Sequence, residues 1–283
     1  MADPTSREQS WADRGRARTA ALAETWESLA DACLGLQPDQ WRQPTGCPGW
    51  SVQDQLSHLI GIERVLDGEV EPDWDEPVGD HVKNEFAAHN EKWIAARRGQ
   101  PGEAIRAEFV DVTNRRVATL RGLSDEAWAL VGPTIVGEVP YAEFMKTRVF
   151  DSWVHEQDVR LALGRPGGSG GAASDIGLGQ VQSAMGFVVG KKAAAPEGTV
   201  VRFSVTGPGH DARQFTLAVT GGRAGPAPQG ATPNVTLTMP SLAFLRLGCG
   251  RAAAAEVEED HGIELGGDVA LGRAILGAMN FMF

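Results

Sequence analysis

The segment RVFDSWVHEQDVRLALGRP, residues 148–166, gives the clearest indication of the fold. It belongs to a helix predicted to run from Pro140, a residue suited to a first helical turn, to about Leu163. Asp151 and His155 are four residues apart in it, so the two side chains lie on the same face of that helix. The segment therefore predicts a helix that presents a carboxylate and an imidazole together.

This face of the helix also carries Phe144 and Ala162, which indicates that it points into a helical bundle. A carboxylate and an imidazole at this spacing can bind one metal ion. A third ligand from a facing helix would still leave a coordination position open, as catalytic metal sites require. The spacing also permits ordinary pairing, in which Asp151 binds Arg148 and His155 binds Glu156 or Asp158. Spacing alone leaves both readings open.

An earlier helix is predicted from Val52 to about Leu66, because Ser51 is a good N-cap and Asp54 complements the helix start. His58 lies within or at the edge of the broad apolar arc of this helix. It is either a buried histidine satisfied by a hydrogen bond or the third ligand from a facing helix. The sequence around it does not separate these two roles.

The residue pattern changes from helical to strand-like after a glycine-rich stretch. Before it, helical patterns dominate and predict an N-terminal bundle of four or more helices over residues 10–164. Residues 165–174 form a linker with few residues that can pack. Residues 175–283 begin with a helix and continue with β-branched, alternating segments, which predict a small α+β domain with an antiparallel sheet. The fold class is thus multidomain, α followed by α+β.

Composition narrows the class of protein. Of 283 residues, 42% are hydrophobic and 22% charged, which is typical of a globular chain and not of a disordered one. The formal net charge of −11 disfavours nucleic acid and anionic membrane surfaces as partners. No run of 18 apolar residues predicts a transmembrane helix, and the N-terminus has no apolar core of a signal peptide.

Three cysteines, Cys33, Cys47 and Cys249, form no CxxC pair, so neither a disulfide framework nor a cysteine-rich zinc site is expected. Reduced cysteines and the missing signal peptide together predict a cytoplasmic protein. Cys47 precedes the helix of His58, where it can act as a small buried residue, a fourth ligand or a reactive thiol. Arg202, Arg213 and Arg251 are candidates for binding a carboxylate. His81 and His89 are expected on a solvent-facing surface.

GCPGWSVQDQLSHLIGIE (46–63) and RVFDSWVHEQDVRLALGRP (148–166) together resemble two helices of the mycothiol-dependent maleylpyruvate isomerase family, which belongs to the DinB-like metal-binding four-helix bundles. The later segments GCGR (248–251) and GGDVALGRAIL (266–276) are similar to the sterol-carrier-like α+β domain that follows the bundle in that family. The resemblance extends over about residues 10–283.

The resemblance implies a metal site and a thiol cofactor. The family's metal is held by a histidine on the second helix and by a glutamate and a histidine on the last one, and these positions fall on His58, Asp151 and His155. The glutamate is thus an aspartate here, shorter by one methylene group. The implied cofactors are a divalent metal, zinc, and mycothiol, and the implied partners are a low-molecular-weight thiol and a small-molecule substrate.

Three functions are compatible with these residues and the resemblance. The first is a metal- and thiol-dependent isomerase or S-transferase acting on a small electrophilic or unsaturated carboxylate through a metal-activated thiolate. The second is a metal-assisted lyase or cyclase of secondary metabolism on the same scaffold. The third is a non-enzymatic protein that binds a small apolar ligand and has a degenerate metal site. The sequence assigns no catalytic or cofactor-binding residue beyond the three metal ligands.

Overall fold

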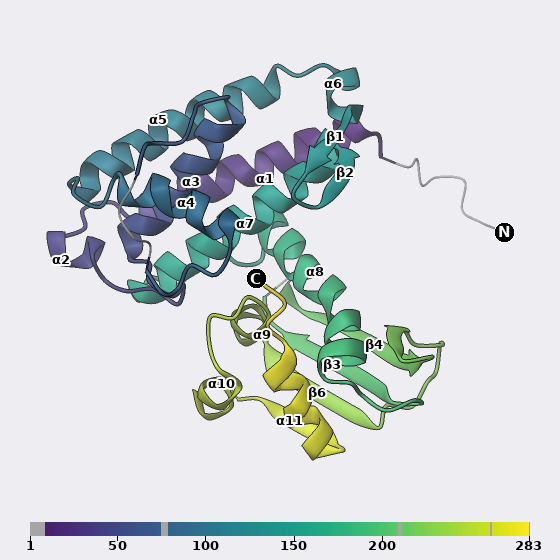
Figure 1. Ribbon diagram of the computed structural model, residues 1–283. Helices are drawn as coiled ribbons and strands as arrows, with labels where there is room; N and C mark the ends of the chain where they lie inside the picture. Colours follow the sequence, from purple (N-terminus) through teal and green to yellow (C-terminus); the bar gives the residue numbers. More distant parts are fainter. Residues whose placement is uncertain (1–8, 75–78, 209–210, 261, 283) are drawn as a thin grey trace. The chain divides into compact units, whose positions relative to one another are not determined.

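The computed structural model describes residues 9–74, 79–208, 211–260 and 262–282. The chain divides into two compact units, residues 1–45 with 49–168 and residues 46–48 with 169–283. The first unit is helical and the second combines helices with a five-stranded sheet (Figure 1). The predicted class, α followed by α+β, is confirmed. No helix in the described part of the chain is long and apolar enough to cross a membrane.

Four long helices form the core of the first unit. Helix α1 packs against α5 and α7, and α3 packs against α4, α5 and α7 (Figure 1). The elements of this unit are α1 (Trp11–Ala32), α2 (Pro38–Trp41), α3 (Val52–Leu66), α4 (Glu85–Ala95), α5 (Gly102–Arg121), α6 (Asp125–Ala129), β1 (Val131–Thr134), β2 (Gly137–Pro140) and α7 (Tyr141–Ala162).

Local signals explain most helix boundaries. The bounds of α3 are those predicted, since Ser51 and Asp54 form a capping box at its start. Helix α7 follows Pro140, which is its N-cap and not its first residue. Helix α1 begins at Trp11, because the Ser10 hydroxyl accepts the Asp13 N–H at 3.1 Å and caps a polar first turn.

The hairpin of β1 and β2 has no counterpart among the predictions. Each strand has only four residues, and Pro133 interrupts the first, so no alternating pattern identifies it. The turn is closed by the Thr134 hydroxyl, which donates to the Gly137 carbonyl at 2.7 Å, and Gly137 adopts a φ of 100°. The hairpin leads directly into α7 and so sets where that helix starts.

A buried carboxylate connects three helices of the first unit. Glu63 of α3 has no exposed surface. Its Oε1 accepts the Nε and Nη2 groups of Arg148 on α7, at 2.9 and 2.6 Å. Its Oε2 accepts Nε of Arg116 on α5 at 3.0 Å. Because two guanidinium groups share one buried carboxylate, the relative placement of α3, α5 and α7 depends on this cluster.

The second unit has its sheet in the strand order β5-β4-β3-β6-β7. Three of the four pairings are antiparallel, as predicted, but β3 and β6 run parallel, which corrects the prediction of a wholly antiparallel sheet. A hydrophobic pattern does not reveal strand direction, so the sequence could not identify this pair. The elements are α8 (Ala172–Phe187), a π-helical turn (Val188–Lys192), β3 (Val200–Thr206), β4 (Arg213–Thr220), β5 (Arg223–Pro226), β6 (Val235–Pro240), α9 (Ser241–Gly248), α10 (Ala254–Asp260), β7 (Glu264–Gly267) and α11 (Val269–Ala278).

Helices cover one face of this sheet (Figure 1). The alternating residues of β3 and β6 that point to this face are buried, and Phe203 stacks on Phe215 with ring centroids 4.8 Å apart. The residues between them, among them Arg202 and Thr236, are only half-buried. The sheet therefore has one apolar, covered face and one polar face.

The Glu63 cluster makes a testable prediction about stability. We expect Glu63→Ala to lower the free energy of unfolding of the helical unit by about 3–5 kcal/mol, because Arg116 and Arg148 are left buried without their shared carboxylate. Urea unfolding followed by circular dichroism measures this. The control is Glu69→Ala, which removes an exposed ion-pair partner of Arg64 and should cost less than about 1 kcal/mol. Equal effects of the two substitutions would contradict the role given to Glu63.

Candidate metal centre

The structure brings together all three residues proposed as ligands. His58 extends from the middle of α3, and Asp151 and His155 from successive turns of α7. The Asp151 Oδ1 atom lies 3.4 Å from Nε2 of His58 and 3.4 Å from Nε2 of His155. One ligand atom from each residue lies within 4.8 Å of the other two. The arrangement can hold a metal ion, and ligation itself stays a prediction.

The surroundings orient these atoms toward one another. Nδ1 of His155 lies 2.5 Å from Oε1 of Gln55, so a proton on Nδ1 binds there and leaves the Nε2 lone pair directed at Asp151. Gln55 is fixed in turn, because its Nε2 donates to the Thr45 hydroxyl at 2.6 Å. Two imidazole nitrogens and a carboxylate oxygen thus converge, and such a group of electron-rich atoms calls for a cation or a proton between them.

Ordinary pairing, the alternative to a metal, is also present, but through other atoms. Arg148 Nη1 donates to Asp151 Oδ2 at 2.8 Å, while Oδ1 is the oxygen that faces the histidines. Asp158 Oδ2 lies 3.5 Å from Nδ1 of His155, on the side opposite Nε2. These contacts restrain the same side chains and leave one coordinating atom on each. The two readings of the sequence are therefore compatible in the structure.

The His58 ring has fewer hydrogen-bond partners than the His155 ring. It is buried, with 4% of its surface exposed, and its Nδ1 has no hydrogen-bond partner among the described residues. Burying an imidazole nitrogen without a hydrogen-bond partner costs free energy. The open Nδ1 indicates that the present contacts do not fully satisfy this histidine.

The electrostatic environment separates the two histidines. Burial lowers the pKa of His58, and the Asp151 carboxylate offsets only part of that effect. Burial also disfavours charge on His155, but the carboxylates of Asp151 and Asp158 outweigh it and raise the pKa of His155. Burial opposes the charge of Asp151 too, yet His58, Arg148 and His155 hold the pKa of Asp151 well below its usual range. The site thus contains a stable carboxylate at neutral pH.

Trp50 forms an aromatic wall beside both histidines. Its ring centroid lies 4.9 Å from that of His58 and 5.6 Å from that of His155. The indole Nε1 donates to Oε2 of Glu91 at 3.1 Å, and the same oxygen lies 3.2 Å from Nε2 of His81. His81 was expected to face solvent, but its Nε2 points to this buried carboxylate. Sequence patterns do not predict this contact, since the residues come from three separate segments.

The other candidates lie elsewhere. Cys47 is half-buried and is not among the described residues whose ligand atoms converge. His89 is partly exposed and pairs with Glu71. Arg202 and Arg213 lie on strands of the second unit, and Arg213 pairs with Asp175 at 3.2 Å. Arg251 follows α9 in that unit.

Comparisons with known proteins agree with this architecture. Residues 22–160 match the family model of the mycothiol maleylpyruvate isomerase N-terminal domain. A crystal structure of a mycothiol-dependent maleylpyruvate isomerase is similar at a TM-score of 0.53 and 16% identity, over 91% of this chain and 95% of that one. A second, of a variant with one histidine replaced by alanine, has a TM-score of 0.50 and 17% identity, over 86% and 92%. No curated protein matches the chain. At such identities the structures establish the fold alone.

The charge environment predicts the titration order of the two histidines in the metal-free protein. We expect His155 to titrate above its ordinary value of 6.5 and His58 below it. Protonated His155 then stabilises the metal-free fold at low pH, and this contribution is lost as the pH rises through its raised pKa. NMR titration of the imidazole signals measures both values.

The matched variant is Asp151→Asn, which keeps the shape of the side chain and removes its charge. It should lower the pKa of His155, because the nearest carboxylate is gone. Two histidines that titrate together, or a pKa of His155 that Asp151→Asn leaves unchanged, would refute the arrangement described.

Proposed function

Because residues 22–160 match the family model of the mycothiol maleylpyruvate isomerase N-terminal domain, we propose that the chain is a metal- and thiol-dependent enzyme. The reaction proposed is isomerisation of, or S-transfer to, a small electrophilic or unsaturated carboxylate, with mycothiol as the thiol. The observation that carries the proposal is the convergence of His58, Asp151 and His155 on one point within the bundle.

The residues present fit a divalent metal. Zinc in proteins takes imidazole nitrogens and carboxylate oxygens, and three protein ligands leave a position for an exogenous group. Asp151 is shorter than the glutamate of the family, but its Oδ1 already lies at equal distances from the two histidines. A bound zinc ion would hold an exogenous thiol in its nucleophilic thiolate form at neutral pH.

The chain's own residues prepare this site. Gln55 holds the tautomer of His155, and Arg148 holds the Asp151 oxygen that faces away from the histidines. Trp50 covers the two imidazole rings and limits the access of water to them. Asp151 is the most exposed of the three, with 26% of its side-chain surface accessible, so a small thiol and its substrate reach the group from the side of the carboxylate.

The test is turnover of maleylpyruvate, and of electrophilic carboxylates, with mycothiol present or omitted. We expect turnover to require the thiol and to disappear after treatment with a chelator. His58→Ala should lower kcat/KM by about 100-fold or more, since loss of a ligand costs at least as much as loss of a group that orients one. His89→Ala, which removes a histidine outside the cluster, should leave kcat/KM unchanged.

The remaining outcomes discriminate between functions. Metal-dependent turnover without any thiol would contradict the proposal and favour a lyase or cyclase. Activity that survives both the chelator and His58→Ala would contradict any role of the cluster in the reaction.

A further inference from the structure

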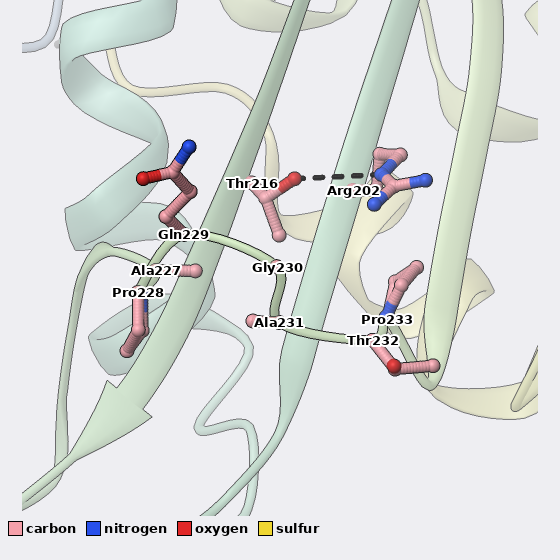
Figure 2. Close-up of a pocket in the computed structure, with 9 residues that line it drawn as sticks. All are labelled: Arg202, Thr216, Ala227, Pro228, Gln229, Gly230, Ala231, Thr232 and Pro233. Carbon is pink, nitrogen blue, oxygen red and sulfur yellow. Dashed lines mark hydrogen bonds between the residues drawn. The ribbon is translucent and has the colours of Figure 1, made fainter.

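The second unit contains a hollow on the polar face of its sheet, and neither the family nor the proposed reaction assigns it a role. Figure 2 shows the connection of residues 227–233 crossing this face beside Arg202 and Thr216. The connection joins β5 to β6, and Arg202 lies on the central strand β3. The hollow has a volume of about 480 Å³, enough for a small organic ligand.

Arg202 is the charged group of this hollow. Residues Thr216 on β4 and Thr236 on β6 flank it in the sheet register. Its Nε donates to the Thr216 hydroxyl at 3.4 Å, and it forms no ion pair with any described residue. The sheet thus fixes the direction of the guanidinium while its two Nη groups remain available. The guanidinium is half-buried, and no described carboxylate neutralises its charge.

The lining of the hollow is polar and contains no acid. Gln229 and Thr232 of the connection, whose sequence is APQGATP, are the other polar residues that line it. A turn shapes it, since the Ala231 N–H donates to the Pro228 carbonyl at 3.1 Å and Gly230 has a φ of 79°. Such a φ at the third residue of the turn is that of a type II turn. The hollow therefore presents one positive charge among neutral hydrogen-bonding groups.

We propose that this hollow binds a small molecule through an anionic group, a carboxylate or a phosphate. The Arg202 guanidinium donates two parallel N–H groups to the oxygens of the anion, and this geometry suits both kinds of group. The Thr216 hydroxyl holds the guanidinium through Nε, so it acts as a positioning residue. Binding here uses no residue of the metal centre.

The experiment is titration of the full protein with succinate and, separately, with inorganic phosphate, at constant ionic strength. Amide chemical shifts followed by NMR report the position of binding, and calorimetry reports the affinity. We expect saturable shifts at Thr216 and within residues 227–233 with at least one of the two anions. Arg202→Gln should weaken that binding at least tenfold, and Arg202→Lys should weaken it less, because lysine keeps the charge but not the paired donors.

The control variant is Arg223→Gln, which removes the same charge from an exposed position in the same unit. It should bind as the parent does. Saturation by only one of the anions supports the proposal and identifies the group that is recognised. No saturable shift with either anion, or equal weakening by Arg202→Gln and Arg223→Gln, would overturn it. His58→Ala should bind the anion normally, so failure of the proposed reaction and failure of this site are distinguishable.

Discussion

The buried ion cluster of Glu63 with Arg116 and Arg148 is the interaction on which the candidate centre depends. It joins α3, α5 and α7 at one point, and Arg148 extends the connection to Asp151. Burying charged groups is costly, and replacing such clusters by apolar side chains often stabilises a fold. The Glu63 cluster serves here to position side chains. The Arg148 guanidinium, which neutralises Glu63, also binds one carboxylate oxygen of Asp151 and leaves the other facing the histidines.

The sequence predicted the parts of the fold that local chemistry determines. Helix α3 was placed correctly from its capping box, and the i, i+4 spacing of Asp151 and His155 put both on the same face of α7. The hairpin before α7 could not be predicted, since its strands are too short to show an alternating pattern. The parallel pairing of β3 with β6 could not be predicted either, since a hydrophobic pattern is the same for both strand directions. The convergence of His58 on the other two is a tertiary property, which the sequence supported only through family resemblance.

The groups that tune the site were the hardest to foresee. Gln55 lies three residues before His58 on the same helix, and that spacing could have identified it as a neighbour of the site. Trp50 and Glu91 come from separate segments, and only the packed structure reveals that the Trp50 indole donates a hydrogen bond to the Glu91 carboxylate. In the second unit, the sequence makes Arg202 one of three arginine candidates for binding a carboxylate. Its half-buried place on β3, beside Thr216 and the connection of residues 227–233, is visible only in three dimensions.

Mass spectrometry of the protein purified without chelator measures its metal content, and this decides whether His58, Asp151 and His155 form a metal site. We expect one equivalent of a divalent metal, zinc foremost, in the parent and in Cys47→Ser, and its loss in His58→Ala and Asp151→Asn. A parent protein that holds no metal even after addition of zinc would contradict this expectation. Asp151 would then mark a site whose carboxylate, histidines and arginine serve only to stabilise the bundle.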